Sequence, residues 1–248
     1  MVPPSELEVR TLTDALSVPQ PPGRPAFKSA SFRTLCETCN SQRLGQLYDP
    51  ELKRFCDRVA TWIRSTTDLG LTLPPSVRLP ARPGAIARAV IGHILAAESG
   101  VKPHAPLSDA PMLAAMRAYF LTAGASAHQD LELFFWPFPS TGHQLARGVG
   151  ISRVLGEPLG PIVGDFLKFF PLAWWLVFRR PSDIQITLSR MPLFPAEADE
   201  GEVAVLLRPV PPPTWPEEPM HDEVLVLNAT RTFLASPATR SPGDPGGA

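Results

Sequence analysis

Proline is the residue that most constrains what this chain can fold into, because it occurs 31 times among 248 residues. Each proline fixes the backbone angle φ and removes a hydrogen-bond donor. The elements between prolines are therefore expected to be short and joined by stiff loops, which argues against a long helical bundle. Hydrophobic residues make up 44% of the chain and charged residues 19%, a composition that can bury a globular core. The length fits one large domain, or one domain with a small appended module.

The charges are unevenly distributed although the net charge is only −1. Residues 31–196 contain 17 Lys and Arg against 12 Asp and Glu, a net of 17 − 12 = +5. Residues 197–248 contain 3 against 9, a net of 3 − 9 = −6. The basic body permits nucleic-acid binding, but its charge is not the concentrated basic stripe that predicts such binding.

Neither the start of the chain nor its most apolar segment predicts export or membrane insertion. The first residues, MVPPSELEVR, lack the basic region and apolar core of a signal peptide. The most apolar run, FFPLAWWLVF at residues 169–178, is about half as long as the roughly 20 residues of a membrane-spanning helix, so we interpret it as a buried strand. Three cysteines, an odd number, argue against a disulfide framework. We therefore expect a cytoplasmic protein without a membrane partner.

Helical patterns precede a block of strand-like patterns along the chain. Asp49 as N-cap, with Pro50 at the first helical position, predicts a helix that ends near residue 64. A second helix is predicted over residues 85–98, and a third from Asp109 onward. Short apolar runs divided by Gly, Pro and Ser then predict strands at 131–138, 143–152, 161–163, 173–178, 184–188 and 203–207, with an edge strand at 223–228. This order predicts an α+β fold with an antiparallel sheet.

The segment FRTLCETCNSQRLG, at residues 32–45, contains the pattern with the most specific chemistry. Cys36 and Cys39, separated by two residues, can hold one zinc ion from a tight turn. Structural zinc usually takes about four ligands, so a redox pair or a coincidence stays open. Cys56 could be a third ligand, yet it lies on the apolar face of the predicted helix, where a thiol packs as a small hydrophobic group. The five histidines show no ligand spacing.

The surroundings of the cysteine pair resemble the second knuckle of HNH endonucleases. The matching pattern is Leu-Cys-x-x-Cys-Asn followed by a basic residue and Gly, here Leu35, Cys36, Cys39, Asn40, Arg43 and Gly45. The continuations LYDPELKRFCDRVATW and PGAIARAVIGHILA are similar to helices in a group of bacterial HNH-like proteins. The resemblance implies a ββα-metal site with an upstream C-x-x-C knuckle, a histidine general base and a divalent ion at the leaving oxygen.

The chain departs from this family pattern before Cys36. No cysteine precedes Cys36 and no histidine precedes His93, so the first knuckle and the catalytic base are absent from their expected positions. We interpret the chain as a degenerate relative, or as one that begins too late, and its catalytic residues remain unknown. Whether it is an enzyme stays open. A catalytic divalent metal is expected only in an active form.

The resemblance implies a zinc ion at Cys36 and Cys39, and DNA as a candidate partner. The nucleic-acid contacts would come from one basic cluster, made of Asn40, Arg43, Lys53, Arg54 and Arg58. A solvated helix face is the alternative interpretation of that cluster. The competing functional hypothesis is a non-catalytic interaction or structural protein, whose α+β body binds another protein. No Gly-rich phosphate loop is found, so no nucleotide cofactor is expected.

These patterns divide the chain into four segments. Residues 1–30 are expected to form an extended arm, residues 31–70 a partial HNH-like knuckle with its helix, and residues 71–210 the α+β domain. Residues 211–248 are expected to form a proline-rich, acidic tail that is disordered from residue 236 onward. The proline run before Trp215 has the composition of a polyproline ligand, although such runs are more often spacers.

Overall fold

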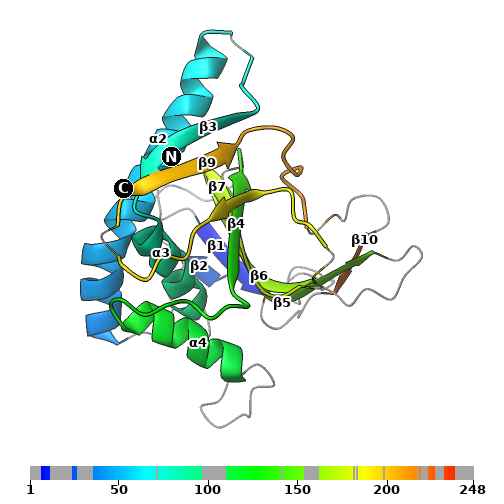
Figure 1. Ribbon diagram of the computed structural model, residues 1–248. Coiled ribbons are helices and arrows are strands. Elements are labelled where there is room, and N and C mark those ends of the chain that lie inside the picture. The colour runs from blue at the N-terminus through cyan, green and yellow to red at the C-terminus, as the bar shows by residue number, and fades with distance from the viewer. Residues whose placement is uncertain are drawn as a thin grey trace, which may run out of the picture.

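The protein has the predicted α+β architecture, with helices packed on antiparallel sheets (Figure 1). The computed structural model describes residues 7–11, 24–26, 36–70, 72–96, 110–140, 142–153, 162–180, 182, 184–197, 199–216, 218, 223–226 and 232–237. Predictions that concern Leu35, Phe32, His104, His221 and residues 238–248 lie outside the described residues.

The helical layer consists of η2 (Thr38–Tyr48), α2 (Asp49–Asp68), α3 (Pro83–Ala96) and α4 (Ala110–Leu121). The first of these is a π-helix that runs into α2 without a break. Asp49 is itself helical, with φ −60° and ψ −36°, and its N–H donates to the carbonyl of Leu44. The α-helix α2 starts at Asp49, as predicted, but Asp49 is not its N-cap, because η2 precedes it without a break. The predicted end near residue 64 is wrong, because α2 continues to Asp68.

Pro50 lies at the junction between the π-helix η2 and the α-helix α2, and its chemistry fits that junction. A π-helical N–H bonds the carbonyl five residues back, as the N–H of Asp49 does to Leu44, whereas an α-helical N–H bonds the carbonyl four residues back. Pro50 follows the last bond of the π type, the one between Asp49 and Leu44. Because proline has no N–H to donate, it suits the point where the hydrogen-bond register changes. Asp49 and Pro50 thus mark the change from π-helical to α-helical hydrogen bonding within one continuous helical segment.

The larger sheet is antiparallel throughout, in the order β2-β1-β11-β5-β6-β7-β4-β8, and β10 also pairs with β5. A separate two-stranded sheet joins β3 and β9. The strands are β1 (Leu7–Thr11), β2 (Arg24–Ala26), β3 (Ser76–Ala81), β4 (Glu132–Pro137), β5 (His143–Arg153), β6 (Ile162–Phe169), β7 (Leu172–Arg179), β8 (Ser189–Met191), β9 (Gly201–Leu206), β10 (Glu223–Val226) and β11 (Thr232–Pro237).

Both ends of the chain contribute strands to this sheet. In the segment expected to be an extended arm, β1 pairs with β2 and with β11. In the segment expected to be a tail, β10 and β11 pair with the two halves of the same edge of β5. Among the described residues, no helix is both long and apolar enough to cross a membrane.

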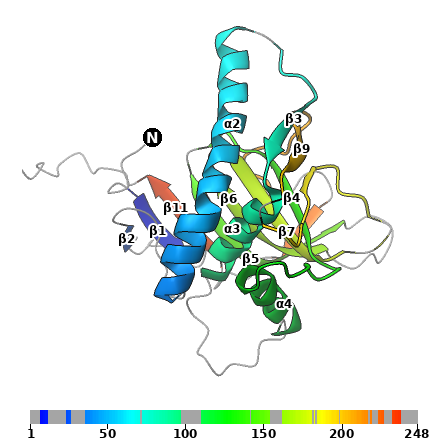
Figure 2. The same cartoon turned by 60° about the vertical axis from the view of Figure 1, so that its left-hand side comes forward.

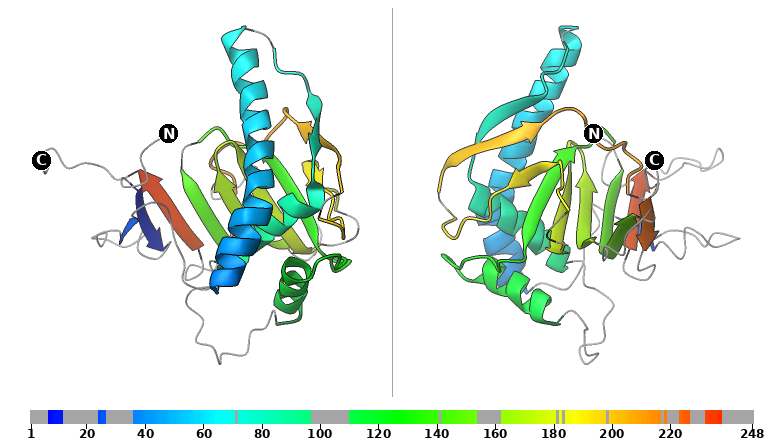
Figure 3. Two further views of the ribbon diagram at one scale, coloured as in Figure 1. Left: turned by 90° about the vertical axis from the view of Figure 1, so that its left-hand side faces the viewer. Right: turned by 45° about the vertical axis from the view of Figure 1, so that its right-hand side comes forward.

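Two hydrophobic cores lie on opposite faces of the central strands. The helices cover one face, and the long helix of η2 and α2 crosses in front of the strands (Figures 2 and 3). The apolar run at residues 169–178, interpreted above as one buried strand, contains the end of β6, a turn at residues 170 and 171, and most of β7. β7 supplies both cores, because its successive side chains point to opposite faces. Trp174 and Leu176 belong to the helix-covered core, whereas Trp175 and Val177 belong to the core on the other face.

Residues 208–216 cover part of that other face through Trp215. The indole of Trp215 is only 5% exposed and packs against Trp136, Phe166 and Trp175 at ring centroid distances of 5.2 to 5.6 Å. The buried amine of Lys168 donates to the backbone carbonyls of Pro213 and Trp215. This proline-rich segment is therefore packed into the molecule.

Candidate functional site at Cys36 and Cys39

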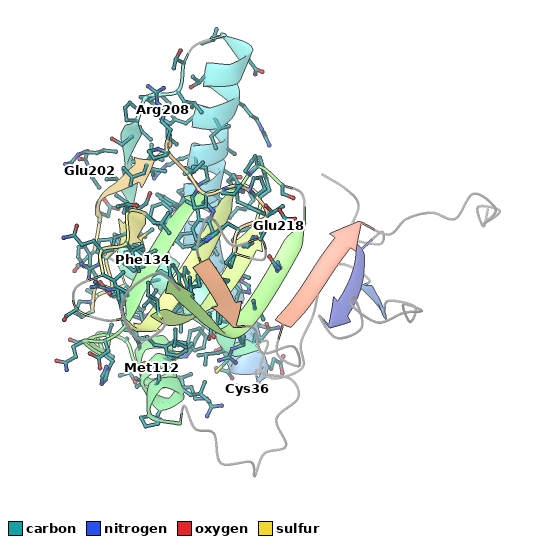
Figure 4. The ribbon with its side chains drawn as sticks, turned by 90° about the vertical axis from the view of Figure 1, so that its right-hand side faces the viewer. Cys36, Met112, Phe134, Glu202, Arg208 and Glu218 are labelled. Carbon is teal, nitrogen blue, oxygen red and sulfur yellow. The ribbon has the colours of Figure 1, made fainter. Side chains whose placement is uncertain are left out.

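The two predicted metal ligands lie together at the start of the long helix. Cys36 immediately precedes the helical residues, and Cys39 lies in the first turn of η2. Figure 4 places Cys36 at the lower end of this helix, opposite the end of α2 that projects from the body in Figure 3. The cysteine pair thus occupies an exposed edge of the helical layer.

Cys36 caps the helix with both its backbone and its side chain. Its carbonyl accepts a hydrogen bond from the N–H of Asn40 at 2.9 Å, and its Sγ accepts one from the N–H of Cys39 at 3.4 Å. A side chain that accepts from the amide three residues later, at the start of a helix, has the arrangement of an N-cap. The sulfur of Cys36 is therefore held over the first turn, on the same side as Cys39.

The surroundings of the two thiols differ, and so do their acidities. Cys36 is exposed, whereas Cys39 is half-buried and packs against the helix-covered core. The hydrogen bond from the backbone of Cys39 lowers the pKa of Cys36 below its ordinary value, and a hydrogen bond between the two thiols acts in the same direction. Burial raises the pKa of Cys39, with a further contribution from Cys36, although the charge of Arg43 opposes it. Cys36 is thus the thiol that ionises first.

The five predicted nucleic-acid residues do not form one free basic surface. Asn40 is exposed and Arg43 half-buried near the cysteines. Lys53 pairs with Asp57 at 2.5 Å, and Arg54 pairs with Glu51 at 2.6 Å. Arg58 donates to the carbonyl of Pro80 on β3. Residues 51–58 carry three basic and two acidic side chains, a net of 3 − 2 = +1, so much of the local positive charge is balanced internally.

Two thiols are the only part of a metal site that the described residues bring together here. Across the described part of the chain, no group of three or more His, Cys, Asp or Glu side chains could hold a metal ion. Cys56 is 6% exposed and belongs to the helix-covered core, as its apolar face predicted. Burial raises the pKa of Cys56 to about 12. Cys36 and Cys39 therefore fit two positions of a zinc site but do not complete it.

Two polar contacts join the helix to its neighbours and were not predicted. His93 Nε2 lies 2.9 Å from the carboxylate of Asp49, and both side chains are about two-fifths exposed. Tyr48 donates to Glu197 at 2.6 Å from a position 149 residues away in the sequence. Nothing in the local pattern signals contacts of such long range, because each depends on how α3 and the segment before β9 pack on η2.

Comparisons with known proteins identify no relative. No family model, no curated protein sequence and no solved structure matches this chain.

Proposed function

We propose that the chain is a degenerate HNH-like protein in which Cys36 and Cys39 supply half of a zinc site, and that a second copy supplies the other half. The observation that carries the proposal is the pairing of two thiols at an exposed helix start without a third ligand among the described residues. Two such pairs provide the four thiolates that structural zinc prefers. Because the cysteine pair lies at an exposed edge, two copies can approach each other there, and one zinc ion would then be shared between the two chains.

Zinc stoichiometry and molecular mass, measured on the same sample, test this proposal. We expect about one zinc ion per two chains and a dimer in sedimentation equilibrium that a chelator dissociates. Cys36→Ser and Cys39→Ser should each remove the zinc and the dimer. Cys56→Ser is the matched control and should change neither, because Cys56 is buried away from the edge. One zinc ion per chain, or no zinc, would overturn the shared site.

Contact between chains without zinc is the second candidate, and exposed apolar side chains favour it. Trp62, on α2, is 40% exposed, and Leu69, the residue after its last helical residue, is 70% exposed. This end of α2 projects from the body (Figure 2). Arg64 stacks over the 37%-exposed ring of Phe170, with its guanidinium carbon 5.4 Å from the centroid. A dimer that survives chelation but is lost in the Trp62→Ser, Leu69→Ser double variant would establish this candidate in place of the zinc-bridged one.

We further propose that any contact with DNA involves Arg43 and the helix face of Lys53, Arg54 and Arg58. Binding would require the three α2 side chains to exchange their internal partners for phosphates, so we expect weak binding that falls steeply with salt. A gel shift at two salt concentrations measures DNA binding. Arg54→Glu on α2 is the test variant, and Arg117→Glu on α4 is the matched control. Equal loss of binding in both variants would remove the assignment to α2. We expect no plasmid nicking with magnesium or manganese.

We propose a cytoplasmic location on the chemistry of the thiols. Cys36, Cys39 and Cys56 are all free, and reducing compartments keep thiols in this form. Fractionation of cells that produce the full chain, with a periplasmic or secreted marker protein as reference, measures its location.

A further inference from the structure

The cysteine pair combines an accessible thiol with a protected one directly behind it. Cys36 is exposed and precedes the helix, so a dissolved reagent can reach its sulfur. Cys39 is half-buried against the core. The hydrogen bond of 3.4 Å from the N–H of Cys39 holds the Cys36 sulfur over the turn that carries the second thiol. The Cys36 sulfur is therefore accessible to a dissolved disulfide, while the Cys39 thiol lies in the turn directly behind it.

The electrostatics of the helix start favour negative charge on the outer sulfur. The first amides of a helix have no partner within the helix, and the helix dipole places partial positive charge there. A thiolate at Cys36 accepts one of these amides, whereas its protonated form accepts less strongly. Cys39 is instead half-buried against the helix-covered core, so a dissolved disulfide reaches it less readily than Cys36. The pair thus contains one attacking thiol and one reserve thiol that reacts second.

We propose that the metal-free Cys36–Cys39 pair is a thiol–disulfide exchange site that reduces low-molecular-weight disulfides. In the first step the Cys36 thiolate attacks one sulfur of the disulfide, the S–S bond breaks, and the departing thiolate takes a proton from solvent. In the second step Cys39 loses its proton to solvent and attacks the Cys36 sulfur; the bond between that sulfur and the substrate sulfur breaks, and the second thiolate departs and takes a proton from solvent. The products are two free thiols and a Cys36–Cys39 disulfide, so two electrons pass from the protein to the substrate.

This inference goes beyond the zinc proposal and is independent of it. Zinc binding uses both thiolates, so the metal would block exchange while it is bound. The two activities are therefore measured on different forms of the same full chain: the dimer in the presence of zinc, and exchange after chelation. Loss of either one leaves the other open to measurement.

Glutathione disulfide is the probe for the experiment, added to the reduced, chelator-treated full chain. Peptide mass spectrometry after rapid acid quenching should find the Cys36–Cys39 disulfide and free glutathione. In Cys39→Ser the reaction should stop at glutathione bound to Cys36. In Cys36→Ser, Cys39 should react about tenfold more slowly than Cys36 does in the wild type. Serine is itself a favoured N-cap, so this variant keeps the helix start. Cys56→Ser should behave as the wild type.

Two results would overturn the inference. The first is glutathione trapped equally on Cys36 and Cys39 in the wild type, without the internal disulfide. The second is an internal disulfide that forms no faster in the folded chain than in the same chain unfolded in guanidinium chloride, because the folded arrangement would then contribute nothing. An oxidised pair whose formation zinc fails to slow would instead show that the metal binds elsewhere, which contradicts the zinc proposal alone.

Discussion

Arg88 is completely buried in α3, and its guanidinium connects α3 to α4 and to two segments outside the helices. It donates to the backbone carbonyls of Gly84, Tyr119, Ala125, Phe194 and Pro195. The same group lies 4.0 Å from the ring centroid of Tyr119 and 3.5 Å from the carboxylate of Glu197. A buried charge is tolerated only when it is paired and hydrogen-bonded. Here the carboxylate of Glu197 pairs with the charge, and the five carbonyls accept the guanidinium hydrogen bonds.

Replacement of Arg88 by methionine should therefore lower the free energy of unfolding by about 3–5 kcal/mol. Methionine keeps the length of the side chain but leaves the buried carbonyls without their donor. Urea denaturation measures the loss. Arg54→Met on the exposed face of α2 is the matched control, with an expected change below about 1 kcal/mol. Similar losses in both variants would contradict the role assigned to Arg88.

Tyr119 should make stability depend on alkaline pH. Burial raises the pKa of Tyr119 to about 12, whereas tyrosine in an unfolded chain has a pKa of about 10. Between these values the unfolded chain has lost a proton that the folded chain keeps, so the free energy of unfolding falls as pH rises. Tyr119→Phe should cost about 1 kcal/mol near neutral pH, where it loses the hydrogen bond to Phe194.

Above pH 10 this deficit should shrink by up to about 1.4 kcal/mol per pH unit, because phenylalanine does not ionise. Denaturation of both proteins across the alkaline range gives the two slopes. Parallel curves would show that Tyr119 ionises equally in the folded and the unfolded chain.

At the scale of elements, η2 is the part of the helical layer that positions the cysteine pair, and it packs on α3 through a close approach at Gly92. A Cβ atom at Gly92 would lie 2.7 Å from both Leu44 Cδ2 and Phe120 Cε2, and both of those side chains are buried. At Gly45, on the exposed side of η2, a Cβ atom would meet only the carbonyl of Asn40, at 3.4 Å. Gly92 thus allows α3 to pack closely against its neighbours, whereas Gly45 lies where a side chain has room.

The same substitution should have opposite effects at these two positions. Gly92→Ala should destabilise the fold by about 1–3 kcal/mol, because Leu44 and Phe120 must move within a packed core. Gly45→Ala should stabilise it by about 0.5–1 kcal/mol, since alanine favours a helix over glycine and the site has room. Thermal unfolding of the two variants beside the wild type separates these outcomes, and a shift of the same sign in both would refute this description of the interface.

The elements that the sequence predicts well are those whose signal is the burial of their own side chains. Every residue of β7 from Leu172 to Phe178 is apolar, so this strand was predictable, whereas the turn at residues 170 and 171 within the same apolar run was not. Alternating Ile184, Ile186 and Leu188 were predicted as a strand, but the strand lies at Ser189–Met191. These three side chains instead pack against the second core from irregular backbone, because burial alone can produce alternation without strand pairing.

The candidate site was predictable in its residues but not in its geometry. Cys36 and Cys39 stand out by their spacing, and Cys56 was correctly placed in the core by the helical period around it. The Asp49–Pro50 pattern did not reveal that the helical segment already begins at the cysteine pair. Proline is compatible both with the first turn of a helix and with the change from a π-helix to an α-helix. The internal partners of Lys53 and Arg58 depend on tertiary packing, which local charge patterns do not contain.

At the scale of the whole molecule, the two cores hold the helical layer and the proline-rich segment on opposite sides of one sheet. Trp215 is the side chain that fixes the segment at residues 208–216 to its face. Trp215→Ala should cost about 3–5 kcal/mol of unfolding free energy. Trp62→Ala, which removes the same group from a 40%-exposed position, should cost far less. Comparable losses in chemical denaturation would show that the segment contributes little to the fold.

The central claim is that Cys36 is the accessible thiol that ionises first and that Cys39 is the protected thiol behind it. The measurement that tests this claim most directly is the rate at which each cysteine of the folded, metal-free chain is alkylated as a function of pH. Peptide mass spectrometry assigns the label to Cys36, Cys39 or Cys56. Because a helix start favours the thiolate of Cys36 and burial disfavours the other two, Cys36 should react at the lowest pH, Cys39 at a higher pH, and Cys56 only after unfolding. Equal reactivity of Cys36 and Cys39 at every pH, or labelling of Cys56 in the folded chain before Cys36, would contradict it.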